Sequence, residues 1–150
     1  MAERRSLYDD VVMDHIKNAR NYRELGNASH AAQGINPLCG DSLWVYARVD
    51  NGVVREAVFQ CECCGISMAS ASIMTELVTG RHVEEVRALA RDFGRLLRAQ
   101  ARPEGTRVSG PALAIIGLIR ESTSRLNCAQ LSWVTLEAAL EGRSQAVLGL

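Results

Sequence analysis

An Asn51-Gly52 pair between two alternating apolar runs constrains this chain more than any other local feature. Both residue types tolerate the positive φ angles of a type I′ turn, so the pair predicts a β-hairpin of about residues 42–60. In such a hairpin Asp50 faces Val53, and each earlier residue of the first strand faces a later residue of the second. The hairpin is therefore expected to be the centre of a small antiparallel sheet.

Cysteines and carboxylates gather at the open end of this hairpin. Extended to the strand ends, the register pairs Val45 with Val58, Trp44 with Phe59, and Cys39 with Cys64. Because side chains alternate between the two faces, the register predicts that one face carries Cys39, Asp41, Glu62 and Cys64. The other face would carry Cys61 and Cys63. Gly40 and Gly65 are expected to bend the chain, so the register is only a guide near its ends.

The candidate ligand set has four members: Cys39, Asp41, Cys64 and Cys128. Cys64 precedes one predicted helix and Cys128 begins another, so both thiols are expected at helix N-termini, which lower a thiol pKa. Three thiolates and a carboxylate suit tetrahedral zinc, and an iron–sulfur cluster is the alternative. The rival motif Cys61-x-x-Cys64 lacks both a second zinc-ribbon pair and a thioredoxin-like context. We therefore favour the four-residue set.

Length and composition favour one domain over residues 1–150, because 47% hydrophobic residues supply enough material for a core. A formal net charge of zero argues against a general nucleic-acid binder. The sequence has neither an apolar run long enough to cross a membrane nor a signal-peptide core, which predicts a cytoplasmic protein without a membrane partner. Five cysteines, three of them within four positions, suit a reducing compartment better than a disulfide framework.

The rest of the pattern is helical, so the predicted fold class is α+β, with the hairpin packed against about five helices. Helices are predicted over residues 6–18, 65–80, 83–100, 111–119 and from 127 onward, with Ser6 and Asn127 as N-caps. One hairpin face should pack on helices, and the first helix should partly cover the other. Residues 19–38 are interpreted as a loop in which a short edge strand could lie. His15, on the apolar stripe of the first helix, is interpreted as a packed residue.

Four motifs in order resemble the IscU/NifU/SufU family of iron–sulfur cluster assembly proteins. They lie at residues 7–21, 36–41 (NPLCGD), 64–72 (CGISMASAS) and 127–133 (NCAQLSW), and the similarity runs from about Leu7 to Leu140. The spacing of 64 positions between Cys64 and Cys128 resembles the inserted helical region of the SufU branch. The resemblance implies an α+β fold with a metal site at one end.

In SufU-like members, three cysteines and an aspartate hold zinc, and the protein accepts persulfide sulfur from a cysteine desulfurase. The resemblance thus implies Cys39 as the catalytic sulfur acceptor, with Asp41, Cys64 and Cys128 as the remaining metal ligands. It also implies a SufS-type desulfurase and downstream cluster-assembly proteins as partners. The alternative is a scaffold on which a [2Fe–2S] cluster is built and passed to acceptors. Whether such a sulfurtransferase is itself an enzyme, which metal is native, and its oligomeric state and downstream acceptor stay open.

Two departures from the family pattern bear on these expectations. IscU-like members have a histidine directly before the last cysteine, and this chain has Asn127 there, which weakens the scaffold interpretation. Relatives usually have glycines where this chain has Cys61 and Cys63. These extra cysteines could be inert, alternative ligands or a relay for the persulfide, and the inert interpretation is favoured.

Overall fold

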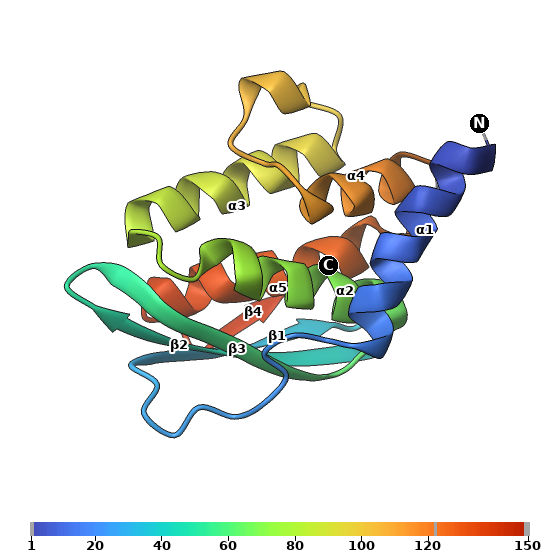
Figure 1. Cartoon of the computed structure of the whole chain (residues 1–150). Helices are drawn as coiled ribbons and strands as arrows, with labels where there is room; N and C mark the ends of the chain where they lie inside the picture. Colours follow the sequence, from blue (N-terminus) through green and yellow to red (C-terminus); the bar gives the residue numbers. More distant parts are fainter. Residues whose placement is uncertain (1, 122, 149–150) are drawn as a thin grey trace.

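The protein is an α+β fold in which helices cover one face of a four-stranded sheet (Figure 1). This computed structural model describes residues 2–121 and 123–148, with side chains from Asp10 onward. The described helices are α1 (Ala2–Lys17), α2 (Gly65–Val78), α3 (Val83–Leu97), α4 (Pro111–Glu121) and α5 (Leu126–Leu140), with 3-10 turns η1 (Pro103–Gly105) and η2 (Thr123–Arg125). The strands are β1 (His30–Asn36), β2 (Asp41–Asp50), β3 (Val53–Glu62) and β4 (Gln145–Val147). The predicted fold class is confirmed.

The sheet order is β3-β2-β1-β4, with β4 parallel to β1 and the other pairs antiparallel. The sheet is therefore mixed rather than purely antiparallel. β1 occupies residues predicted as loop, and it lies inside the sheet rather than at its edge. Its composition, His-Ala-Ala-Gln-Gly-Ile-Asn, has little β-propensity, so pairing on both sides rather than local preference forms the strand. His30 begins this strand and is half-buried.

The hairpin turn is confirmed, because Asn51 and Gly52 have φ angles of 51° and 74°. The register beyond it differs from the prediction. Val49 faces Val54, but Arg48 faces Glu56, so Arg55 is the extra residue of a β-bulge. The predicted pairs of Val45 with Val58 and Trp44 with Phe59 are consequently wrong. Val45 instead faces Phe59, and Trp44 faces Gln60.

Helices α2 and α5 lie directly on the sheet, and α3 and α4 pack outside them (Figure 1). Trp133 of α5 stacks on Phe93 of α3 with ring centroids 4.4 Å apart, and both side chains are buried. Gly34 of β1 lies under α5, where an added Cβ would collide with the Thr135 hydroxyl. Close contact between this strand and this helix therefore requires glycine.

The first helix differs from the prediction in two ways. It begins at Ala2, so Ser6 is not its N-cap, and the side chains of the predicted cap lie outside the described residues. It packs against α2 and α4 rather than on the free face of the sheet. The segment that follows α1 runs along the edge strand β3 near Tyr22, where the Arg23 amide donates to the Phe59 carbonyl. No helix in the described chain is long and apolar enough to span a membrane.

Candidate metal centre

The four predicted ligands meet at one end of the sheet, although they come from separate parts of the chain. Cys39 lies in the turn between β1 and β2, and Asp41 is the first residue of β2. Cys64 immediately precedes α2 with extended φ and ψ angles, as expected for an N-cap. Cys128 is the third residue of α5, because that helix begins at Leu126 and Asn127 is not its N-cap.

The side chains of three of these residues form a compact donor group. One carboxylate oxygen of Asp41 and the sulfurs of Cys64 and Cys128 all lie within 4.8 Å of one another. The sulfur of Cys39 lies 3.6 Å from that of Cys128. Ligand atoms of a tetrahedral site with Zn–S bonds of about 2.3 Å stand about 3.8 Å apart. The atoms of Asp41, Cys64 and Cys128 therefore have the spacing of metal ligands, and Cys39 adjoins this group through its contact with Cys128.

Two hydrogen bonds from the protein orient the carboxylate of Asp41. The Cys64 amide donates to Asp41 Oδ1 over 3.2 Å, and the Ser67 hydroxyl donates to Oδ2 over 2.9 Å. Each carboxylate oxygen has a second lone pair, so these bonds leave capacity for a metal. The Ser67 hydroxyl also lies 3.0 Å from the Cys128 carbonyl and 3.6 Å from the Cys64 sulfur. One serine thus contacts three of the four predicted ligands.

The buried acids of this centre have no basic partner among the described residues. Asp41 is 5% exposed and Cys128 is 2% exposed, and neither forms an ion pair with a lysine or arginine in the described part of the chain. A carboxylate buried in this way, and any thiolate formed beside it, requires a compensating charge. A divalent cation bound by the thiolates would supply it, so the donor chemistry also fits zinc.

The two thiols at helix starts have opposite pKa shifts. Burial opposes ionisation of Cys64, but hydrogen bonds from the Ser67 amide and hydroxyl and from the Cys128 thiol outweigh it, so the Cys64 pKa is lowered. The pKa of Cys128 is instead raised, first by burial and then by hydrogen bonding with Cys39 and the nearby Cys64. The predicted lowering is therefore correct for Cys64 and wrong for Cys128. A thiol enclosed among other sulfurs gains less from the helix end than it loses by desolvation.

Cys39 differs from the other three residues because it is exposed. Its turn is closed by the Asn36 carbonyl, which accepts the Cys39 amide over 3.2 Å and the Gly40 amide over 2.9 Å. Gly40 has a φ angle of 72°, a conformation that favours glycine. The Asn36 side chain is fully buried, and its amide has no hydrogen-bond partner among the described residues. The turn therefore presents an exposed thiol beside the half-buried Cys64 and the buried Asp41 and Cys128.

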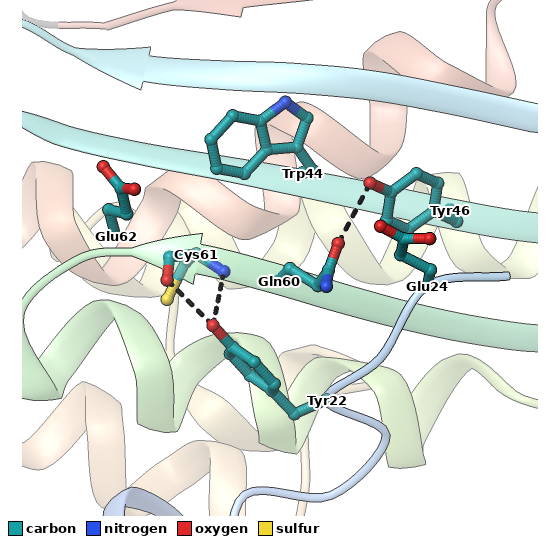
Figure 2. Close-up of a pocket in the computed structure, with 7 residues that line it drawn as sticks. All are labelled: Tyr22, Glu24, Trp44, Tyr46, Gln60, Cys61 and Glu62. Carbon is teal, nitrogen blue, oxygen red and sulfur yellow. Dashed lines mark hydrogen bonds between the residues drawn. The ribbon is translucent and has the colours of Figure 1, made fainter.

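The predicted division of hairpin residues between two faces is wrong beyond the bulge. Ser42 faces Glu62, and Glu62 lies on the outer face of the sheet with Trp44 and Gln60 (Figure 2). Asp41 is on the buried face instead, two residues before Leu43. Asp41 and Cys64 still meet because β3 ends at Glu62 and the chain turns inward before α2. Cys61 and Cys63 are half-buried and joined by a disulfide, which the sequence did not predict.

Ser67 was missed by sequence reasoning, although it stands three residues after Cys64, where a helical side chain lies on the same face. His15 is 4% exposed and its Nδ1 lies 2.7 Å from the Ser72 hydroxyl. Its interpretation as a packed residue is confirmed.

An α+β fold whose thiols and buried carboxylate converge at one end of a sheet defines a class of metal-binding proteins. Residues 7–100 match the model of the NifU-like N-terminal domain. The chain therefore belongs to the NifU-like N-terminal domain family. Among relatives, it is 36% identical to the "Zinc-dependent sulfurtransferase SufU" of Bacillus subtilis over 88% of each chain.

Other relatives carry the scaffold name. The chain is 31% identical to the "Iron-sulfur cluster assembly scaffold protein IscU" of Thermotoga maritima, covering 90% of this chain and 93% of that one. A crystal structure of FiSufU from Fervidobacterium islandicum superposes with a TM-score of 0.80 at 26% identity, covering 87% of this chain and 94% of that one. The resemblance to this family and to its SufU branch is confirmed.

Proposed function

We propose that this protein is a zinc-dependent sulfurtransferase that accepts persulfide sulfur from a cysteine desulfurase on Cys39 and passes it to iron–sulfur cluster assembly. One observation carries the proposal: Cys39 is the exposed thiol of the group, yet its sulfur lies 3.6 Å from the buried Cys128. An acceptor must reach a partner's persulfide, whereas the other donors can stay enclosed. The similarity to SufU of Bacillus subtilis supports this choice.

Zinc would be held by Cys39, Asp41, Cys64 and Cys128. When bound, it would keep the thiols deprotonated, which is the state required for nucleophilic attack on sulfur. The hydrogen bonds of Asp41 with Cys64 and Ser67 would hold the carboxylate in place when Cys39 leaves the metal. Asp41, Cys64 and Cys128 would then remain as ligands.

The transfer itself is an exchange between sulfurs. The Cys39 thiolate attacks the outer sulfur of the desulfurase persulfide, forming a new S–S bond while the desulfurase thiolate leaves. No net oxidation occurs, because one persulfide replaces another. We further propose that the donor is a SufS-type desulfurase and that the sulfur continues to downstream cluster-assembly proteins.

The first test combines metal content with persulfide formation. Protein purified without chelators should contain about one zinc per chain, and mass spectrometry after incubation with a SufS-type desulfurase and cysteine should locate a persulfide on Cys39. Cys39→Ala should abolish both this persulfide and the stimulation of desulfurase turnover. Glu104→Ala, in the exposed loop between α3 and α4, is the control and should behave as wild type. Full stimulation by Cys39→Ala would refute the acceptor role.

The second candidate function is a scaffold for a [2Fe–2S] cluster, favoured by the IscU name of the Thermotoga maritima relative. Three thiols and a carboxylate can also hold iron, whereas Asn127 stands where IscU-like proteins have a histidine. Anaerobic incubation with iron and sulfide separates the two functions. A stable visible chromophore that moves to an apo-acceptor favours the scaffold, and retention of zinc favours the sulfurtransferase.

A further inference from the structure

Cys61 and Cys63 form a second sulfur pair beside the metal centre, and the proposed transfer uses neither of them. Their sulfurs are bonded to each other, their Cα atoms lie 5.4 Å apart, and both side chains are half-buried. A single residue, Glu62, separates them. At the end of β3, Cys61 and Cys63 are therefore close enough to exist either as two thiols or as a disulfide.

The pair lies next to the ligands in space as well as in sequence. Ser42 faces Glu62 across the β2–β3 ladder, so Cys63 follows at the level of Asp41. The next residue, Cys64, donates its amide to Asp41. Cys39 lies in the turn that enters the neighbouring strand, two residues before Asp41. The acceptor residue and the pair therefore lie at the same end of two adjacent strands.

The two cysteines of the pair are held differently. The Tyr22 hydroxyl donates to the Cys61 carbonyl over 2.9 Å and accepts the Cys61 amide over 3.2 Å, which fastens this residue within β3. Cys63 lies beyond the last residue of that strand. Cys63 is therefore the member that can turn toward the metal centre, while Cys61 stays in place to receive it.

The pair is also accessible from outside the metal centre. Cys61 borders a surface hollow of about 380 Å³ on the outer face of the sheet, walled by Tyr22, Trp44 and Tyr46 (Figure 2). The Cys61 side chain itself points to the buried face, because Cys61 faces Leu43 across the ladder. Both cysteines are nevertheless only half-buried, so a reductant that binds beside the hollow has partial access to the disulfide.

We infer that Cys61 and Cys63 form a redox dithiol that reduces the sulfur delivered to Cys39 and releases it as sulfide. The inference rests on the proposed acceptor function of Cys39. Persulfide sulfur is at oxidation state zero, whereas cluster sulfide is at minus two, so two electrons must be supplied. Two adjacent thiols supply that number when they become a disulfide.

The reaction balances in two exchanges. First, the Cys63 thiolate attacks the outer sulfur held on Cys39, forming a persulfide on Cys63 and releasing the Cys39 thiolate. Second, the Cys61 thiolate attacks the inner sulfur of Cys63, forming the Cys61–Cys63 disulfide and expelling hydrosulfide, which takes up a proton in water. A dithiol reductant of the thioredoxin class then returns the disulfide to two thiols.

The test is a single turnover in which cysteine, limited to the amount of protein, is the only thiol added. Zinc-loaded protein is reduced, desalted and incubated anaerobically with a desulfurase and cysteine, and sulfide release, the Cys39 persulfide and the state of each cysteine are measured together. Wild type should release about one sulfide per chain and form the Cys61–Cys63 disulfide. The double variant Cys61→Ser with Cys63→Ser should keep the persulfide on Cys39 and release at least about tenfold less sulfide. Glu62→Gln, which leaves both thiols, is the matched control.

A second arm separates this inference from the proposed function. Inorganic polysulfide replaces the desulfurase, so the thiols are loaded directly. If the desulfurase never loads Cys39, the acceptor function fails, but pair-dependent sulfide release with polysulfide still supports the dithiol. Equal sulfide release by wild type and the double variant in both arms overturns the inference. So does a persistent Cys39 persulfide beside a pair that stays reduced.

Discussion

At the residue scale, Ser67 connects the donor atoms of the metal centre. Its hydroxyl donates to Asp41 and lies within contact of both Cys64 and the Cys128 carbonyl. Groups that orient metal ligands commonly affect metal affinity by about 10–100-fold, although they never touch the metal. Ser67 is therefore expected to be a positioning residue.

Ser67→Ala should weaken zinc binding by about 10–100-fold, because the Asp41 carboxylate loses one of its two hydrogen bonds. The measurement is competition with a chromophoric chelator. Ser70→Ala is a matched control, because Ser70 is also buried in α2 and bonds α5 through the Ala129 carbonyl without touching the centre. The assignment fails if both variants bind zinc like wild type, or if both weaken it equally.

At the scale of elements, a buried histidine connects α1 to α2. The Ser72 hydroxyl accepts the Arg20 amide over 2.9 Å and lies 2.7 Å from His15 Nδ1. Burial lowers the pKa of His15, and the Arg20 guanidinium adds to this effect against the opposing carboxylates of Glu76 and Asp14. The ring is therefore neutral in the folded protein where the unfolded chain would already bind a proton.

This difference predicts that the free energy of unfolding falls as the pH decreases below about 6.5, by up to about 1.4 kcal/mol per pH unit, until the folded pKa is reached. The unfolded state binds more protons in this window, so acidification favours it. Urea unfolding at several pH values between 7 and 5 measures the slope, which His15→Gln should reduce. His82→Gln, at an exposed histidine before α3, should keep the wild-type slope. An unchanged slope in His15→Gln contradicts the assignment.

Contact between β1 and α5 depends on Gly34. An added Cβ would collide with the hydroxyl of Thr135, which is fully buried and cannot move aside. Gly34→Ala should therefore lower the free energy of unfolding by about 1–3 kcal/mol, the usual cost of overpacking. Urea denaturation checks the value against Gly26→Ala, where an added Cβ has no neighbour within 4 Å. Equal stability of the two variants would show that the helix can shift away from the strand.

Some elements of this fold could be predicted from local sequence pattern, and others could not. The helices and the hairpin follow from apolar periodicity and from the turn chemistry of Asn51 and Gly52. β1 has no such pattern, because Ala and Gly have little strand preference and the strand forms only between two partners. The bulge at Arg55 was likewise not predictable, because Val53 and Val54 are both apolar and the alternation in β3 is interrupted there.

At the scale of the molecule, zinc would join the turn after β1, the start of β2, and the starts of α2 and α5. A ligand that binds only the folded state stabilises it in proportion to the logarithm of its concentration. At free zinc about 100-fold above its dissociation constant, the gain is about 2.7 kcal/mol, which corresponds to roughly 5–10 °C in Tm. Calorimetry in zinc-buffered solutions should show this shift for wild type.

Cys128→Ser is the comparison variant, because it removes the ligand that α5 contributes. Its Tm should depend much less on zinc than that of the wild type. A zinc-independent Tm in the wild type would contradict a metal that joins these segments. A shift of equal size in both proteins would place the stabilising zinc elsewhere.

The sequence by itself determined the hairpin turn, most of the helices and the set of candidate ligands, because turn chemistry, apolar periodicity and residue type are local properties. Only the tertiary structure decided how the ligands meet. The bulge places Glu62 on the face opposite to Asp41, the chain turns inward at Cys64, and α5 crosses the sheet to bring Cys128 within reach. The disulfide of Cys61 and Cys63 also emerged only there. Contacts between distant segments depend on how all the layers pack together, which a local pattern cannot encode.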